Sequence, residues 1–334
     1  MDTKPFAVVT RDAEAGAACL RCGPSGETEW RFEHRARPAG PKTPPDGRAF
    51  PARLQHFEYR PSPDGIDANL LVFFHGLGDS PSPFAKLGTQ FALPQTAILA
   101  LRAPCELPLE LGNGWFDVID IAKSDFIKPQ LGETRRVRSL LECLDDLDAA
   151  LEVLLKCGWI HKEIFLFGFS QGGTAAMEWA LHREHELFGG IVAVAAGLME
   201  ERQWPELWPP QKKSESKAIG TSSKTGEKAP GDCLILAGRR DTSVPPSWAN
   251  KSAALFSGTA HCVGSTTLDS KRFSAEVVFF DKAHGMLGSP QEAKAVMTFL
   301  APRLIWISAW EQDPDVHLVG SSGARDASVE CMHG

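Results

Sequence analysis

The sequence has no long hydrophobic run, and this excludes membrane-spanning proteins. The longest apolar stretch, Ile191 to Ala196, is far shorter than the roughly 20 residues that a transmembrane helix needs. Charged residues also interrupt the first 20 residues, which therefore lack the apolar core of a signal peptide. We predict a protein without a transmembrane segment, located in the cytoplasm.

An excess of basic residues is absent as well. The chain has 35 Lys and Arg against 42 Asp and Glu, a formal net charge of −7. A large nucleic-acid interface needs a basic face, so we expect no nucleic-acid partner. The short cluster Arg135, Arg136 and Arg138 opens an amphipathic helical pattern, and we interpret it as a solvated helix face.

The eight cysteines show no disulfide-framework spacing, which indicates free thiols in a reducing compartment. Cys19 and Cys22 form one CxxC pair, but a structural zinc site needs a second pair of ligands, and none stands out. No flanking motif indicates lipidation of this pair either. We predict neither a metal site nor a cofactor.

Short, near-continuous apolar runs alternate with helical patterns, and no internal repeat is present. Runs of this kind are typical of strands buried on both faces of a parallel sheet. One helix is indicated by leucines spaced three and four residues apart between 140 and 155, another by the N-cap Ser289 with Glu292 three residues later. We predict a doubly wound α/β domain over residues 54–306. The strand-like runs are Leu70–Phe74, Ala97–Leu101, Ile164–Phe167, Gly190–Ala195, Cys233–Ala237 and Glu276–Phe280.

Three segments do not fit this domain. Residues 1–53 end in a stretch rich in Pro and Gly and are expected to be a flexible or loosely docked extension. Residues 200–231 begin with "EERQWPELWPP", a possible short lid, and continue into a polar stretch typical of disorder. Residues 307–334 are polar and are expected to form a C-terminal tail.

The stretch "IFLFGFSQGGTAAMEWAL" places Ser170 between a predicted strand and a predicted helix. This is the setting of a nucleophile elbow, in which a serine sits on a sharp strand-to-helix turn. Gly168 and Gly172 fit it because a side chain at either position would collide with the neighbouring strand or helix. The alternative is a glycine-rich turn with a satisfied hydroxyl, but the context favours a nucleophile.

A nucleophilic serine needs a histidine base and an acid that orients it. Asp241 follows the apolar run "CLILAG", and His284 follows "EVVFFD", so both come just after a strand and in the order serine, acid, histidine. Asp281 is a rival acid that belongs to the same strand end as the histidine. His261 follows no strand, and His182 and His185 are expected to be exposed.

An acyl-transfer site also needs N–H donors for the developing oxyanion. We predict the backbone N–H of Gln171, which follows the serine, and that of Leu77 in "FFHGLGDS". His75 precedes Ser170 in the chain, and we assign its ring a structural role in holding the Leu77 loop.

Six segments together resemble the phospholipase/carboxylesterase family, which includes the acyl-protein thioesterases. They are "FFHGLGDS", "LRAP", "GWFDV", "GFSQGG", "GRRDTSVP" and "AHGM", and the resemblance runs from about Asn69 to Leu304. It implies an α/β-hydrolase fold with a mostly parallel sheet covered by helices on both faces. It also implies cofactor-free hydrolysis of carboxylic esters or thioesters by Ser170, Asp241 and His284, with Leu77 and Gln171 as oxyanion residues. Trp115 matches an aromatic position near the acyl site, so Trp115 and Phe116 become candidate substrate contacts.

The chain departs from this family's pattern at positions that bear on the choice of substrate. Thr242 stands where proline usually follows the triad acid, and the stretch after "WFD" is longer and more apolar. Apolar segments at 107–111, 115–121 and 204–207 either line an acyl groove or cover the core. We expect a serine hydrolase of thioesters or esters with an apolar acyl chain, acting on a lipid, a small ester or an acylated protein. The alternatives are a carboxylesterase or lysophospholipase and, more distantly, a non-catalytic binding protein; the oligomeric state stays open.

Overall fold

The computed structural model describes residues 8–11, 17–21, 30–33, 42–183, 187–208, 231–258 and 273–307. The chain divides into two compact units, one formed by Met1–Ala39 with Ile305–Gly334 and the other by Gly40–Leu304. In the first unit, three strands pair into an antiparallel sheet, β1 (Val8–Arg11), β2 (Ala17–Arg21) and β3 (Trp30–Glu33). Cys19 lies in β2, whereas Cys22 and most of both predicted termini lie outside the described residues.

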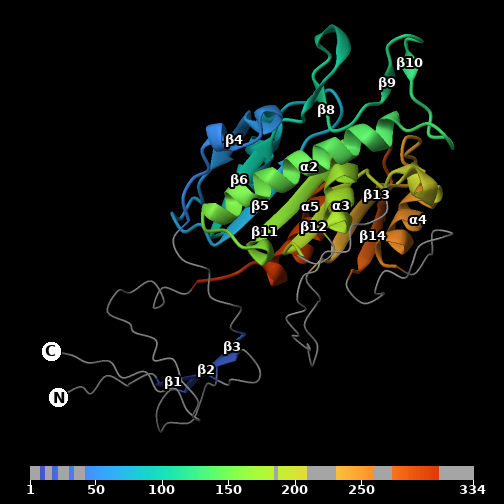
Figure 1. Cartoon of the computed structure of the whole chain (residues 1–334). Coiled ribbons are helices and arrows are strands. Elements are labelled where there is room, and N and C mark those ends of the chain that lie inside the picture. The colour runs from blue at the N-terminus through green and yellow to red at the C-terminus, as the bar shows by residue number, and fades with distance from the viewer. Residues whose placement is uncertain are drawn as a thin grey trace, which may run out of the picture. The chain divides into compact units, whose positions relative to one another are not determined.

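The second unit is built on a seven-stranded sheet (Figure 1). Its order is β14-β13-β12-β11-β5-β6-β4, and every neighbouring pair is parallel except β4 with β6. The strands are β4 (Phe57–Arg60), β5 (Asn69–Phe74), β6 (Thr96–Leu101), β11 (Ile164–Phe169), β12 (Gly190–Val194), β13 (Cys233–Gly238) and β14 (Ala275–Phe280). The six predicted apolar runs are the six parallel strands, and the predicted fold class is confirmed.

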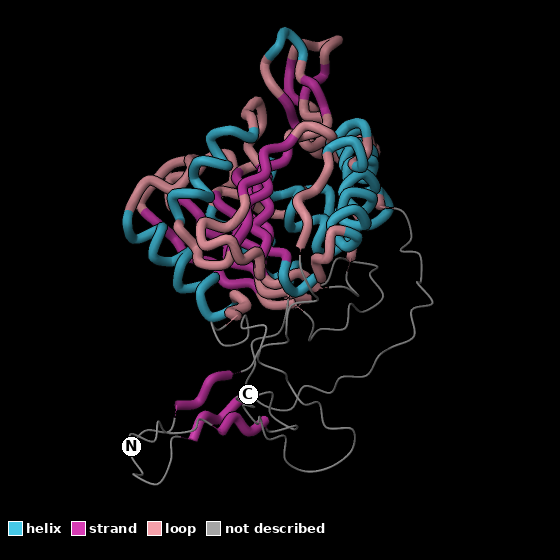
Figure 2. The backbone as a smooth tube through the Cα atoms, turned by 90° about the vertical axis from the view of Figure 1, so that its left-hand side faces the viewer, coloured by secondary structure: helices cyan, strands magenta, loops and turns pink. Residues whose placement is uncertain are grey.

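Helices cover both faces of this sheet, as Figure 2 shows from the side. Side chains of α1 (Pro81–Phe91) and α5 (Pro290–Leu300) pack in the core on one face. Those of α2 (Arg135–Lys156), α3 (Gln171–His182) and α4 (Pro246–Phe256) pack in the core on the other. None of the helices in the described ranges is long and apolar enough to cross a membrane.

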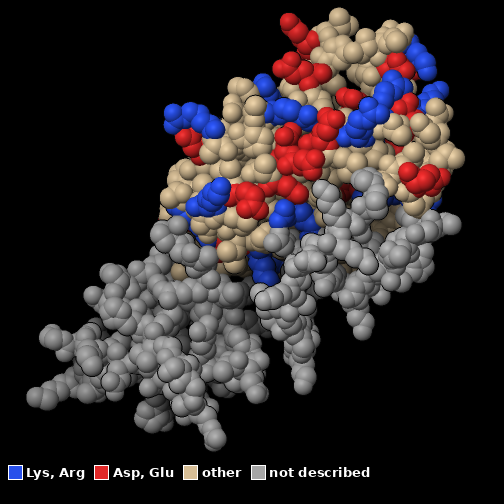
Figure 3. Space-filling view, viewed as in Figure 1, with Lys and Arg blue, Asp and Glu red and all other residues tan. Residues whose placement is uncertain are grey.

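The leucine pattern of α2 buries one face of that helix against the sheet, with Leu140, Leu144 and Leu147 at most 1% exposed. Its opposite face carries exposed charges such as Glu142 and Asp145. Red acidic groups and blue basic groups lie close together on the face of the molecule shown in Figure 3. A helix with an apolar stripe and a charged outer face is stabilised mainly by packing of the stripe.

Two short hairpins follow β6 and stand at the top of Figure 1. The first pairs β7 (Cys105–Glu106) with β8 (Asn113–Gly114), and the second pairs β9 (Ile119–Asp120) with β10 (Asp125–Phe126). Single 3-10 turns complete the unit: η1 (Gly47–Ala49), η2 (Ala52–Leu54), η3 (Pro108–Glu110), η4 (His161–Glu163), η5 (Glu200–Gln203), η6 (Pro205–Leu207) and η7 (Ala301–Arg303).

The segment before β4 is more firmly held than expected. The Lys42 ammonium forms an ion pair with Glu163, and these side chains are 2% and 0% exposed. Phe50 and Leu54 are buried in the same core as α2. From residue 42 onward the expected loose extension is therefore packed against the sheet-containing unit, because it supplies apolar side chains and a partner for a buried carboxylate.

Candidate active site

Ser170 sits in the tight turn between β11 and α3. Its φ and ψ are 52° and −121°, a conformation that L-residues rarely adopt, and its N–H donates to the Val194 carbonyl at 2.9 Å. A Cβ added at Gly168 would lie 2.4 Å from the Gly173 Cα, and one at Gly172 would lie 2.3 Å from the Phe74 carbonyl oxygen. The turn is thus strained and closely packed, as the glycine pattern predicts.

Ser170, His284 and Asp241 come together at the carboxyl ends of three strands. The His284 Nε2 lies 2.9 Å from the Ser170 Oγ, and its Nδ1 lies 2.8 Å from the Asp241 Oδ2. Since a carboxylate only accepts, Nδ1 carries the proton and Nε2 is free to accept from the serine hydroxyl. The arrangement is that of a serine activated by an oriented histidine.

Asp241 is held as an acceptor by its own loop. The backbone N–H groups of Ser243 and Val244 both donate to its Oδ1 at 2.8 Å, so Oδ2 faces His284. The Asp241 side chain is 0% exposed, whereas that of the rival Asp281 is 80% exposed and pairs with Arg240. Thr242, in the position where the family usually has proline, does not disturb this geometry. His261 and His185 lie outside the described residues, and His182 is a surface neighbour of Asp148.

Of the two predicted oxyanion residues, Leu77 lies in the loop after β5 and Gln171 is the first residue of α3. In the described part of the chain, neither the Leu77 nor the Gln171 backbone N–H donates to another residue. A Cβ built on Gly114 of the first hairpin would lie 3.0 Å from both the Leu77 Cδ1 and the Gln171 Oε1, so these two side chains flank one point. Unpartnered backbone N–H groups can bind a developing negative charge.

His75 has the structural role that we predicted. Its Nε2 accepts from the Ala103 N–H at 3.0 Å, and its Nδ1 lies 2.7 Å from the Gly76 carbonyl oxygen. Nδ1 therefore carries the proton, and the neutral ring joins the Leu77 loop to the end of β6. Burial lowers the pKa of His75 below its usual 6.5, which favours this neutral form.

The side chains of Trp115 and Phe116 are buried, whereas the predicted substrate contacts would require them to be accessible. They are 0% and 3% exposed, with Trp115 packed on Phe74 at 4.7 Å between ring centroids. The Trp115 indole N–H donates to the His75 carbonyl at 2.8 Å, which turns the ring inward. This corrects the prediction: in this structure both rings are buried and offer almost no surface to a ligand.

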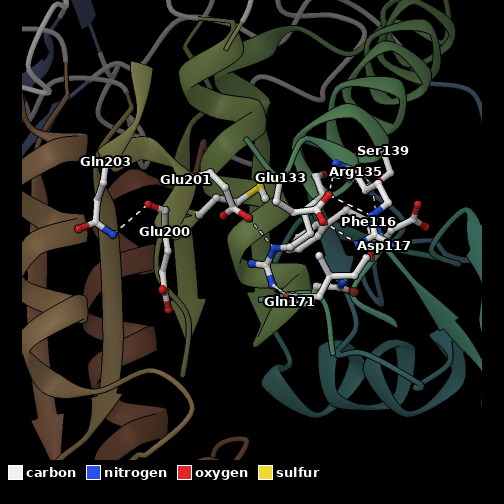
Figure 4. Close-up of polar contacts among 12 residues, drawn as sticks. Phe116, Asp117, Glu133, Arg135, Ser139, Gln171, Glu200, Glu201 and Gln203 are labelled. Atoms are coloured by element: carbon white, nitrogen blue, oxygen red, sulfur yellow. Dashed lines mark hydrogen bonds and ion pairs between the residues drawn. The ribbon is translucent and has the colours of Figure 1, made fainter. Parts of the chain in front are cut away.

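The Gln171 side chain binds the backbone of that same loop (Figure 4). Its Oε1 accepts from the Trp115 N–H, and its Nε2 donates to the Phe116 carbonyl, both at 2.8 Å. One residue further on, the Asp117 N–H donates to the Ser139 hydroxyl of α2 at 2.8 Å. The two Gln171 contacts, which the motif did not reveal, hold the segment after the first hairpin against the Ser170 turn, and the Asp117 contact holds it against α2.

The described part of the expected lid, residues 200–208, packs against α2 and α3. Glu201 pairs with Arg136 at 2.6 Å, and Arg202 pairs with Glu178, both carboxylate side chains being 0% exposed. Burial raises the pKa of Glu201, and the charge of Arg136 opposes this. Arg136 therefore belongs to a buried ion pair instead of a solvated face, and residues 209–230 lie outside the described residues.

The cysteines and acidic groups give no sign of a second chemistry in the described ranges. Cys105, Cys143, Cys157 and Cys233 are free thiols, and burial raises the pKa of Cys105 to about 11. A thiol with so high a pKa is a poor nucleophile at neutral pH. No group of three or more His, Cys, Asp or Glu side chains there is placed to hold a metal ion.

Comparison with known proteins agrees with this architecture. Residues 61–215 match the model of the phospholipase/carboxylesterase family. An uncharacterized hydrolase of Mycosarcoma maydis is 39% identical over 150 residues, which cover 42% of this chain and 54% of the relative. Acyl-protein thioesterase 1 of Cryptococcus neoformans var. neoformans is 29% identical over 154 residues, covering 44% of this chain and 60% of the relative. The chain thus spans little more than half the length of these curated relatives.

Among solved structures, esterase PE8 superimposes with a TM-score of 0.54 over 75% of this chain and 99% of its own. The two sequences are 18% identical, so this likeness concerns the fold. The chain therefore has the α/β-hydrolase fold, and its resemblance to the phospholipase/carboxylesterase family is confirmed over residues 61–215.

Proposed function

We propose that this chain is a serine hydrolase that cleaves carboxylic thioesters or esters with an apolar acyl chain. Ser170 is the nucleophile, His284 the general base and Asp241 the acid that orients it. One observation carries the proposal: an unbroken chain of hydrogen-bonding contacts at 2.9 and 2.8 Å from the Ser170 hydroxyl through the imidazole to the Asp241 carboxylate.

In the first half of the reaction, the Ser170 Oγ attacks the acyl carbonyl while His284 Nε2 takes the hydroxyl proton. Asp241 keeps the proton on Nδ1 and stabilises the imidazolium that forms. His284 then protonates the leaving thiolate or alkoxide, and an acyl-enzyme remains on Ser170. Water repeats the same proton transfers and releases the carboxylic acid.

The oxyanion forms beside the N-terminus of α3, where the backbone N–H groups of Leu77 and Gln171 have no other partner among the described residues. Their positions are supported by the ring of His75 and by the side chain of Gln171, which are themselves buried and hydrogen-bonded. Preorganised donors of this kind stabilise the tetrahedral intermediate, typically by enough to change the rate a hundredfold to a thousandfold, about 3 to 4 kcal/mol.

The acyl chain is proposed to lie along the first hairpin. Leu109 and Leu111 at its tip are 90% and 57% exposed, and Leu77 beside its base is 36% exposed. The hairpin abuts the Leu77 loop, since the Gly78 N–H donates to the Asn113 carbonyl at 2.9 Å. Exposed apolar side chains on a hairpin that adjoins the Leu77 loop favour a substrate with a hydrocarbon chain.

The test is covalent labelling of the purified protein by a fluorophosphonate probe, which reacts with activated serines. Labelling should be seen in the parent and in Ser247→Ala, a control at an exposed position in α4, and should be lost in Ser170→Ala. The rates of hydrolysis of an oxygen ester and a thioester with the same acyl group are then compared, and they show which leaving group the protein prefers. A folded parent that neither labels nor hydrolyses either compound would instead favour a binding protein on the same fold.

A further inference from the structure

Lys282 lies two residues before His284, in the loop between β14 and α5. Its ammonium donates to the carbonyl oxygens of Gly285 and Met286, at 3.0 and 3.1 Å, and forms an ion pair with Glu292. The ammonium is thus bound to two backbone carbonyls and paired with one carboxylate. The Lys282 side chain is only 17% exposed, so these bonds are formed largely away from water.

Glu292, in the first turn of α5, binds the other end of the loop. Its Oε2 accepts from the Gly288 N–H and from the Ser289 hydroxyl, both at 2.9 Å, and its side chain is 3% exposed. The ion pair therefore links the two residues that directly follow His284 to the start of the helix. Buried charges of opposite sign persist where such hydrogen bonds satisfy them.

This loop determines where the His284 ring lies. Phe169 is its aromatic neighbour, at 5.6 Å between ring centroids, and its polar contacts are Asp241 and Ser170. A shift of the loop backbone by about 1 Å would break the alignment of Nε2 with the serine, a change that typically costs up to a hundredfold in rate.

We propose that Lys282 and Glu292 are a positioning pair that fixes the His284 loop for catalysis. The inference rests on the proposed function, in which His284 is the base. Neither side chain touches Ser170 or Asp241 in the described structure, so the pair acts only through the backbone that carries His284.

A substrate-binding role for Lys282 is the competing explanation. A cavity of about 510 Å³ is lined by residues of the segment 280–292, among them Lys282, His284 and Glu292. The ammonium is, however, already bound to two backbone carbonyls and paired with Glu292, and these contacts favour a positioning role. A positioning role and a binding role differ in which kinetic constant changes.

The experiment compares Lys282→Met, Lys282→Arg and the double variant Lys282→Met/Glu292→Met with the parent. The control is Asp281→Asn, which alters an ion pair of the same loop whose partners, Arg240 and Asp281, are 66% and 80% exposed. Ester hydrolysis gives kcat and KM, fluorophosphonate labelling gives the reactivity of Ser170, and urea denaturation gives the free energy of unfolding.

We expect Lys282→Met to lower kcat and the labelling rate together by about tenfold to a hundredfold, with KM nearly unchanged. Lys282→Arg should recover part of this loss because it keeps the charge and the donors. The double variant leaves no unpaired buried charge, so it should be more stable than Lys282→Met yet equally slow. Asp281→Asn should behave like the parent.

Parent-like kcat and labelling in Lys282→Met would contradict the positioning role of the pair, and so would a change confined to KM. Neither result would contradict the proposed function. Recovery of kcat in the double variant along with stability would also contradict the positioning role, since the effect would then be one of folding. A folded parent protein that is neither labelled nor hydrolyses esters would contradict both proposals, because His284 would then not act as a catalytic base.

Discussion

The Gln171 side chain donates from Nε2 to the Phe116 carbonyl at 2.8 Å and so joins the Ser170 turn to the segment that follows the first hairpin. The same residue offers its backbone N–H to the proposed oxyanion. Gln171 thus combines a supporting side chain with a proposed oxyanion donor, and substitution can separate the two because the N–H survives any change of side chain except proline.

Gln171→Ala should lower stability more than it lowers the reactivity of the serine. It leaves the Trp115 N–H and the Phe116 carbonyl buried without partners, at a cost of about 1 to 3 kcal/mol for each group. Urea denaturation measures the loss of stability, and kcat is measured well below the unfolding transition. A stability equal to that of the parent would mean that the loop does not depend on this side chain.

Asp241→Asn should lower kcat by about 10³- to 10⁴-fold with little change in folding. The amide oxygen would keep the Ser243 and Val244 N–H groups, which places the NH₂ group opposite His284 Nδ1. Nδ1 must then accept, and the Nε2 proton points at Ser170 and blocks its activation. Asp281→Asn is the matched control, and if it proved the more damaging change, the rival acid would replace Asp241.

Gly172→Ala should abolish labelling and reduce the yield of folded protein. The new Cβ would lie 2.3 Å from the Phe74 carbonyl oxygen and 2.4 Å from that of His75, and backbone atoms cannot rotate aside. Gly285→Ala is the control, because a Cβ there meets nothing within 4 Å. A soluble, fully labelled Gly172→Ala protein would show that the turn is looser than the structure indicates.

Much of this arrangement follows from sequence pattern. The six parallel strands were predictable because each is a near-continuous apolar run, and residues after parallel strands meet at one edge, which brings Ser170, Asp241 and His284 together. β4 was not predicted, because its residues Phe57–Arg60 are half-buried or exposed and form no apolar run.

Other features depend on contacts that no local pattern encodes. The strands of both hairpins are two residues long, too short for any periodicity. Trp115 is buried because its indole reaches a carbonyl forty residues away in the chain. Lys282 looks like an ordinary surface charge, and only Glu292, predicted as part of a capping box, hinted at order there: Ser289 does accept the Glu292 N–H at 3.3 Å.

The neutral ring of His75 should make stability depend on pH. Because burial lowers its pKa in the folded state, the unfolded chain takes up the proton first as the pH falls. The stability that depends on neutral His75 is therefore complete above its unfolded pKa of about 6.5 and is lost progressively below it. His75→Gln should lack this part of the decline.

The measurement is the free energy of unfolding of the parent and of His75→Gln at about pH 7.5 and 5.5, on either side of the unfolded pKa. Groups that titrate in both proteins cancel when the two differences are compared. The variant is expected to be less stable at the higher pH, with a smaller loss on acidification. Equal losses would show that His75 protonates in the folded state without cost.

Exposed leucines of the first hairpin should influence the preference for acyl-chain length. Leu109→Ser/Leu111→Ser removes two side chains that are 90% and 57% exposed, so stability should change by less than about 0.5 kcal/mol. Since each buried methylene contributes about 0.8 kcal/mol, loss of even two contacts should lower kcat/KM for a long-chain ester about tenfold or more. Short-chain esters, which do not reach the tip, should be hydrolysed as before.

Ile121→Ser provides the comparison for this change. Ile121 is 73% exposed, but it belongs to the second hairpin, whose strands do not pair with the Leu77 loop. Gly78 and Asp79 instead contact Asn113, so it is the first hairpin that adjoins the Leu77 loop. Equal losses of kcat/KM for long and short esters in the double variant would indicate a distorted site. A chain-length effect in Ile121→Ser would instead indicate that the acyl chain lies along the second hairpin.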